Sequence, residues 1–338
     1  MKILAIQFRY FGDTVLIVPA LRALREHLPD CELHLLVPEE ARPLFEHLPW
    51  LTRLWSMPRT RARARVSDSW PILRALRRER FDRSVDFGGN DRGAILSLLC
   101  AARERVGPLV PGGFWGRRFC YTQTVPRAPG DMHEVMRNVG LLAAWKIPPP
   151  SSLELEIHAD PTLEKSARAV LPERAILCHI ASSQPKKEWP LDHWVALHEM
   201  AQAAGLQLVL STGRAAREMS LLDALRGRLP KAQILPPDQP LATFLAWLKG
   251  AAVFISGDTG PLHFAGALGV PTIGLFGATC ARNWAPIGPK HQSIQGPECH
   301  CPGDAFECEG TSHCLAAIEP AEVLKRLQMA VERNGLRS

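Results

Sequence analysis

One stretch in the C-terminal third of the chain, residues 251–279, constrains the fold more than any other. Two apolar runs of strand length, Ala252–Ser256 and Thr272–Phe276, show no polar alternation and are separated by a segment of helix length. Continuous apolar strands joined by a helix are typical of a parallel sheet that is covered on both faces. The stretch therefore predicts a βαβ unit within an α/β domain.

The turn after the first of these strands carries the polar residues of the unit. Residues 257–260 read Gly-Asp-Thr-Gly; the glycines allow a sharp turn, and Pro261 suits the first turn of a helix that Asp258 or Thr259 would cap. Backbone N–H groups at a helix N-terminus bind anions, and His263 would face the same crevice. Two interpretations stay open: a well-capped βαβ unit without a ligand, and an anion site.

The same stretch carries a family resemblance. Residues 258–279 read DTGPLHFAGALGVPTIGLFGAT. This resembles the signature of the heptosyltransferase family, which builds the inner core of lipopolysaccharide. Its members are two-domain glycosyltransferases of the GT-B type that use ADP-heptose as donor. The resemblance implies that Asp258, Thr259, Gly260 and His263 bind the donor.

Length and composition are those of an ordinary globular chain. With 338 residues, 46% hydrophobic and 22% charged, the chain has room for two domains. No apolar run reaches the roughly 18 residues that span a bilayer, and the N-terminus enters a strand instead of a signal peptide. We therefore expect a cytoplasmic protein whose nine cysteines are reduced or metal-bound.

The net charge of +6 is concentrated in residues 53–83, which hold ten arginines and three acidic residues. A solvated basic helix face is one interpretation, and no motif supports a nucleic-acid partner. An anionic inner-membrane surface or a phosphorylated glycolipid would suit the same charge. We assign four of these residues to the acceptor or to the membrane beside it: Arg59, Arg61, Arg63 and Arg65.

The N-terminus predicts a buried strand, Lys2–Gln7, followed by a helix that opens at Asp13 and bends at Pro19. Asp13 is either an N-cap or a carboxylate at a ligand-binding first βα loop. The segment resembles the family's N-terminal Gly-Asp motif, in which the aspartate is the proposed general base. Residues 8–11, FRYF, look closer to the subgroup that adds the third, branching heptose, and Arg9 is assigned to the acceptor.

A second polar loop, residues 181–190 with the sequence ASSQPKKEWP, follows an apolar strand. Hydroxyls and lysines can bind phosphate oxygens, although a solvated loop is the alternative. The loop resembles the family's hydroxyl pair followed by Lys-x-Trp-Pro, which implies that Ser182, Ser183 and Lys187 bind the donor. Glu218 matches a position where relatives hold the ribose hydroxyls; a solvated helix carboxylate is the alternative there.

Strand and helix signals alternate through both halves of the chain, and three prolines at 148–150 predict a stiff linker. The Pro/Gly-rich residues 107–130 predict a mobile loop, and Leu153–Ile157 predicts the first strand of the second half. Neither a Gly-x-Gly-x-x-Gly nor a Walker motif occurs, so dinucleotide redox chemistry and NTP hydrolysis are not expected. We predict an α/β GT-B fold in which two Rossmann-like domains face a central cleft: an acceptor domain at 1–150, a nucleotide-sugar domain at 151–319, and a helix in 320–338 that packs back on the first domain.

Four cysteines near the C-terminus form the last candidate site: Cys299, Cys301, Cys308 and Cys314. Reduced thiols that pack a short loop, a metal site and disulfides all stay open. The Cys-x-Cys spacing differs from that of the usual structural zinc sites.

Together with the resemblance, these residues predict an inverting glycosyltransferase that needs no cofactor and, since no Asp-x-Asp occurs, no metal. It would transfer heptose from ADP-heptose to the lipopolysaccharide inner core. Asp13 would take the acceptor proton, while Lys187, the serine hydroxyls and the N–H groups of Thr259 and Gly260 stabilise the departing diphosphate. The alternatives are a GT-B nucleotide-sugar 2-epimerase, a transferase with another nucleotide sugar, and an inactive sugar- or lipid-binding scaffold.

Overall fold

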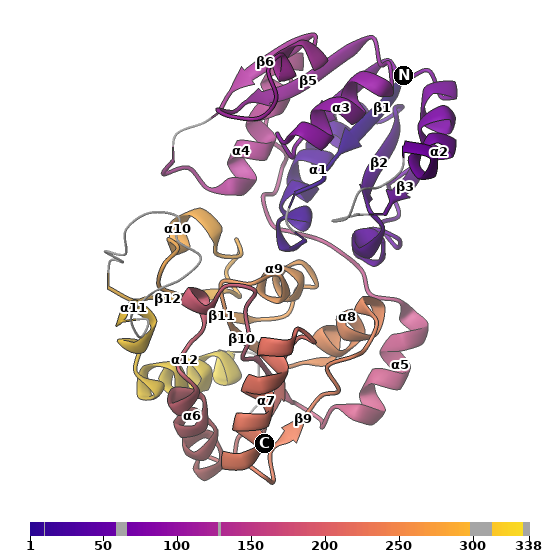
Figure 1. The fold of residues 1–338 in the computed structure, drawn as a ribbon. Coiled ribbons are helices and arrows are strands. Elements are labelled where there is room, and N and C mark those ends of the chain that lie inside the picture. Colours follow the sequence, from indigo (N-terminus) through magenta and orange to yellow (C-terminus); the bar gives the residue numbers. More distant parts are fainter. Residues whose placement is uncertain (10, 59–65, 128–129, 298–312, 334–338) are drawn as a thin grey trace. The chain divides into compact units, whose positions relative to one another are not determined.

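The computed structural model describes residues 1–9, 11–58, 66–127, 130–297 and 313–333 (Figure 1). The chain divides into two compact units, residues 1–153 and residues 154–338. Each unit has its own six-stranded parallel sheet, so the prediction of an α/β chain with two Rossmann-like halves is confirmed. Within the described ranges no helix is long and apolar enough to cross a membrane.

The sheet of the first unit has the strand order β3-β2-β1-β4-β5-β6. Its central strand β1 is fully buried along Ile3–Ile6, which is why this segment reads as a continuous apolar run. The strands are β1 (Lys2–Ile6), β2 (Glu32–Pro38), β3 (Arg53–Met57), β4 (Arg83–Asp86), β5 (Glu104–Leu109) and β6 (Gln123–Pro126).

The first unit contains four α-helices and four 3-10 helices within its described residues. Pro19 lies in the first turn of α1, so the expected bend is wrong. Proline, which lacks an N–H, suits a helix start, and the chain reaches it through a separate 3-10 helix. The helices are η1 (Gly12–Ile17), α1 (Val18–His27), η2 (Glu39–Leu44), α2 (Val66–Arg78), α3 (Asp91–Leu99), η3 (Arg117–Cys120), α4 (Glu134–Gly140) and η4 (Leu141–Trp145).

The second unit repeats the order of the first. Its sheet has the strand order β9-β8-β7-β10-β11-β12. Its strands are β7 (Ile176–His179), β8 (Leu208–Ser211), β9 (Gln233–Ile234), β10 (Val253–Gly257), β11 (Thr272–Phe276) and β12 (Gln292–Gln295). Its helices are α5 (Pro161–Val170), η5 (Pro185–Lys187), α6 (Leu191–Ala203), α7 (Ala216–Arg228), α8 (Leu241–Gly250), α9 (Gly260–Ala267), α10 (Ala281–Trp284), α11 (His313–Ala316) and α12 (Pro320–Arg333).

Each sheet reverses its strand order at one place, between β1 and β4 in the first unit and between β7 and β10 in the second. In open α/β sheets the loops at the carboxyl ends of the strands on either side of such a reversal diverge and leave room for a ligand. The topology therefore provides one candidate binding position in each unit.

Two predicted segments differ from the structure. Residues 107–130, expected as a mobile loop, contain the end of β5, η3 and β6, and the Arg117 side chain donates to the Val110 carbonyl within the segment. Leu153–Ile157, expected as a strand, pairs with no strand of the described sheet. Its alternating burial arises because Leu155 and Ile157 pack inward, and the Ile157 N–H donates to the Ala267 carbonyl.

Helix α12 packs beside α6 and against β10 and β11 of the second unit (Figure 1). Val323, Leu327 and Val331, spaced four apart, form its buried face and share a core with the β10 side chains. The expectation had this helix on the first domain, whereas the contacts described here belong to the second unit.

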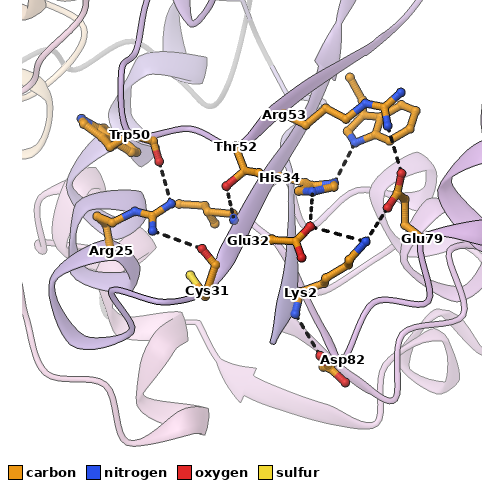
Figure 2. A network of polar contacts seen from close by, with 12 residues as sticks. Lys2, Arg25, Cys31, Glu32, His34, Trp50, Thr52, Arg53, Glu79 and Asp82 are labelled. Atoms are coloured by element: carbon orange, nitrogen blue, oxygen red, sulfur yellow. Dashed lines mark hydrogen bonds and ion pairs between the residues drawn. The ribbon is translucent and has the colours of Figure 1, made fainter.

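The amino ends of β1, β2 and β3 are joined by a polar network (Figure 2). The Glu79 carboxylate accepts from Lys2 Nζ at 2.8 Å and from Arg53 Nη1 at 2.9 Å, and Glu32 lies 3.4 Å from the same ammonium. His34 accepts a hydrogen bond from an indole N–H, and burial lowers the pKa of its imidazole. This network lies at the amino ends of the strands, whereas the candidate binding position of this unit lies at their carboxyl ends, so we assign the network a structural role.

Candidate active site

The second unit brings Lys187 and Asp258 together at its strand-order reversal. Lys187 lies at the end of η5, in the loop after β7, and Asp258 directly follows β10. Lys187 Nζ donates to Asp258 Oδ2 at 2.6 Å, with the aspartate side chain 5% exposed and the lysine 20%. Two residues that the sequence assigned to the donor from separate motifs thus form one ion pair, in which the aspartate is buried and the lysine side chain is partly exposed.

His263 lies on the other side of the same carboxylate. Its Nε2 is 3.7 Å from Asp258 Oδ1, and the ring is buried in the first turns of α9. Thr259 is the N-cap residue of α9, but its side chain makes no capping hydrogen bond, so the expectation that Thr259 caps this helix is wrong. The N-terminus of a helix is a position at which backbone N–H groups can bind an anion.

Gly257 has a different role from the one expected. Its backbone is not in the left-handed region, so a sharp turn does not require glycine here. A Cβ at this position would lie 2.5 Å from the Lys187 carbonyl oxygen. Glycine is therefore needed because the Lys187 loop lies directly against the end of β10.

A side-chain clamp that sequence reasoning missed holds this loop. Glu188 accepts from the Ser182 N–H at 2.8 Å and from Arg217 at 2.5 and 2.9 Å. Arg217, from α7, also donates to the Ser182 carbonyl. The one available signal was the charge of Glu188 inside the Lys-x-Trp-Pro motif, since an arginine on an exposed helix predicts only a solvated side chain.

The remaining residues of the loop divide into buried and exposed groups. The Ser182 hydroxyl is buried and accepts from the Gln184 N–H at 3.2 Å, whereas Ser183 is exposed. Trp189 is buried and donates to the Ile318 carbonyl at 2.9 Å, with its ring edge-on to Trp194 at 4.8 Å. The tryptophan therefore anchors the loop, and Ser183 is the hydroxyl that solvent can reach.

Glu218 caps a helix in this structure. Its Oε2 accepts from the Ala215 N–H at 2.9 Å, at the start of α7. A Cβ at Gly213 would lie 2.3 Å from the same oxygen, so glycine makes room for this arrangement. The hydrogen bond gives Glu218 a structural role, and its assignment to the donor stays a prediction.

In the first unit Asp13 lies in the loop after β1, at the corresponding reversal. It is the second residue of η1, whose N-cap position is occupied by Phe11, so the N-cap alternative is wrong. The side chain is half-buried. Its position in the first βα loop is the one at which a carboxylate can meet a ligand.

A cavity of about 800 Å³ lies in the first unit, lined by the loops after β1, β4 and β5 and by α4. Arg9 and Arg137 both line it, and both donate to Glu134, at 2.7 and 3.0 Å. The Glu134 side chain is almost fully buried, so it fixes two guanidinium groups on one wall. Arg9 therefore lines a cavity with part of its charge balanced, and its assignment to the acceptor stays a prediction.

A second buried carboxyl supports the loop after β4. Tyr121 donates to Asp86 Oδ2 at 2.6 Å, and the Gly88 N–H donates to Oδ1 at 2.9 Å. Burial raises the pKa of Asp86 to about 6, against the lowering effect of these donors. Gly88 lines the cavity, so Asp86 shapes the cavity wall from behind.

Several predicted residues lie outside the described part of the chain: Arg59, Arg61, Arg63, Arg65, Cys299, Cys301 and Cys308. Cys314 is described, and its thiol is buried. Among the residues whose placement is described, no three His, Cys, Asp or Glu side chains are grouped so as to hold a metal ion.

Comparison with known proteins gives a consistent result. The family model "Glycosyltransferase family 9 (heptosyltransferase)" matches residues 70–308. The chain is similar to lipopolysaccharide heptosyltransferase 3 of Escherichia coli, with 24% identity over 294 residues, 82% of this chain and 84% of the relative. The structure of E. coli ADP-heptose lps heptosyltransferase II matches with a TM-score of 0.79 and 21% identity, covering 99% of this chain and 100% of that one.

A third match is the structure of E. coli heptosyltransferase WaaC with ADP-2-deoxy-2-fluoro heptose. It has a TM-score of 0.72 and 20% identity, and the match covers 97% of this chain and 99% of that one. These likenesses agree with the two parallel α/β sheets described above. The chain belongs to glycosyltransferase family 9, and it is a glycosyltransferase.

Proposed function

We propose that this protein transfers heptose, with inversion, from ADP-heptose to the inner core of lipopolysaccharide. The observation that carries the proposal is the Lys187–Asp258 pair beside the N-terminus of α9. A cation and a row of N–H groups at one strand-order reversal suit a sugar diphosphate. The names of the relatives, a lipopolysaccharide heptosyltransferase and an ADP-heptose enzyme, support this choice of substrates.

In the proposed reaction the C-terminal unit stabilises the leaving group. Lys187 Nζ and the N–H groups of Thr259 and Gly260 would face the negative charge that develops on the diphosphate, and Ser183 would add a hydroxyl. Lys187 then has to share its ammonium between Asp258 and phosphate. A sugar hydroxyl that donates to Asp258 would replace part of the contact that the lysine gives up.

The N-terminal unit would present the acceptor. Asp13 would accept the proton of the attacking hydroxyl, and the cavity with Arg9 and Arg137 would hold the anionic inner-core sugar. Similarity to a heptosyltransferase 3 supports the assignment to the branching-heptose subgroup. A lipid-linked acceptor would place the protein on the cytoplasmic face of the inner membrane, and the role of the four arginines at 59–65 stays a prediction.

A panel of nucleotide sugars, with binding measured by calorimetry and products by NMR, tests this proposal. We expect ADP-heptose to bind more tightly than other nucleotide sugars and to react with inner-core acceptor, with inversion at the anomeric carbon. Interconversion of a nucleotide sugar without any acceptor would identify an epimerase. Binding that is never followed by transfer would identify a scaffold, and Lys187→Ala serves as the donor-site control.

A further inference from the structure

Exposed apolar side chains are concentrated in one region of the first unit. Nine large apolar residues are exposed in the described part of the chain, and six of them fall between residues 95 and 119. Trp115 is 93% exposed, so it meets almost nothing but water, and Phe119 is 61% exposed. We name this set the aromatic surface: Ile95, Leu98, Leu109, Phe114, Trp115 and Phe119.

Specific contacts join the segments of the aromatic surface. Helix α3 packs on η3, with Ala94 in a small buried cluster beside Cys120. Asp91, at the start of α3, accepts from the Phe114 N–H and from Arg117 Nη1, both at 3.3 Å. The exposed aromatic rings are therefore carried by a segment that is tied to a helix, and they do not sit on an unattached loop.

The stretch of sequence that carries the aromatic surface is basic. Residues 91–120 contain five arginines and two acidic residues. The Arg118 guanidinium lies over the Phe119 ring, 4.7 Å from its centre, and within the described ranges no carboxylate lies at ion-pair distance from it. Aromatic rings flanked by arginine match the interface of an anionic bilayer, where rings enter the headgroup region and cations meet lipid phosphate.

The aromatic surface also borders the cavity of the first unit. Gly113 and Arg117, within the segment that carries the rings, line that cavity. A sugar bound there would have its lipid anchor close to these rings. A second copy of the chain is a poorer partner for this surface. In a two-fold dimer the Arg118 side chains of the two copies would approach each other, with no carboxylate to balance their charge.

We propose that the aromatic surface inserts into the interface of an anionic membrane and holds the cavity over a lipid-linked acceptor. This inference rests on the proposed function. It differs from the arginine assignment at 59–65 because it places the contact on α3 and the segment after β5. It also requires apolar insertion in addition to charge.

Vesicle flotation with phosphatidylcholine, with and without phosphatidylglycerol, tests the proposal. Trp115→Ala/Phe119→Ala should weaken binding to anionic vesicles by roughly tenfold or more. Arg118→Gln should weaken it about fivefold, and only where anionic lipid is present. Val170→Ala and Arg168→Gln, exposed residues on α5 of the second unit, are the matched controls and should bind like the parent.

A second arm separates this inference from the proposed function. The aromatic variants should keep parental rates on a lipid-free inner-core saccharide and lose transfer to the vesicle-bound acceptor. Equal vesicle binding by parent and variants would overturn the proposal, and so would a parent dimer that the aromatic substitutions dissociate in the absence of lipid. If the parent binds vesicles through these rings but transfers to neither acceptor, the proposed function fails and the membrane surface stands.

Discussion

Removal of the Lys187 ammonium should lower both catalysis and stability, and the two effects can be separated. Asp258 is 5% exposed and its Oδ2 lies 2.6 Å from Nζ, so Lys187→Ala leaves a buried carboxylate without its cation. Breaking a buried pair costs about 3–5 kcal/mol, and because the lysine is partly exposed we expect about 2–3 kcal/mol here. For a unit of this size that lowers the melting temperature by about 5–10 °C.

The loss of diphosphate stabilisation should add a kinetic effect. We expect transition-state stabilisation to decrease by about 2–4 kcal/mol, which lowers kcat/KM for transfer roughly 30- to 1000-fold. Initial rates of ADP release report catalysis, and thermal denaturation followed by circular dichroism reports stability. Lys186→Ala, one residue away in the same loop, is the matched control and should leave both near the parental values.

A double-mutant cycle with Asp258→Asn identifies the origin of the effect. In the Asp258→Asn background no buried charge is left, so Lys187→Ala should cost little stability. If Lys187 acts on the diphosphate, the same substitution should still lower kcat/KM by one order of magnitude or more. No further kinetic loss in that background would refute the reasoning, because Lys187 would then serve only to neutralise Asp258.

Three other perturbations address the rest of the site. Asp13→Asn should reduce transfer roughly 100-fold or more with little change in melting temperature, and unfolding of this variant would instead indicate a structural role. Arg217→Gln should raise KM for the donor more than it lowers kcat, because the Lys187 loop loses its clamp. Arg226→Gln, which removes an exposed ion pair on the same helix, is the control. Equal kinetics in both variants would contradict the role of the clamp. The parent should lose first-unit stability as pH rises from about 4 to 6, as measured by urea unfolding at a series of pH values. Asp86→Asn should abolish this loss. Burial raises the folded pKa of Asp86 from 3.8 to about 6, so its neutral form is the stable one; this is worth roughly 3 kcal/mol at 1.36 kcal/mol per unit, and an unchanged pH profile would disprove it.

The central strands were predictable because both of their faces are covered. β1, β2, β10 and β11 are buried along nearly their whole length, and such strands read as apolar runs. The edge strands β6 and β12 escaped prediction because they are short, largely polar and partly exposed to solvent. Leu153–Ile157 shows the reverse case, since an alternating pattern arose from packing without strand pairing.

The site was predictable only where one segment carries a complete signal. The motifs named Lys187 and Asp258 separately, but the contact between residues 71 positions apart depends on strand order. The Arg217–Glu188 clamp joins α7 to a loop after another strand; the charge of Glu188 is visible in its motif, but nothing local indicates that the two residues pair. Contacts of this kind are created by the tertiary fold, so they could not be predicted from the sequence alone.

The close approach at Gly257 has a consequence for comparing relatives of this protein. A methyl group there would meet the Lys187 carbonyl oxygen at 2.5 Å, and a backbone atom cannot rotate away as a side chain can. A homologous chain could retain the lysine, the aspartate and the histidine and still lose the geometry through Gly257→Ala alone. Surveys that separate active members from silent copies should therefore score this side-chain-free position together with the charged ones.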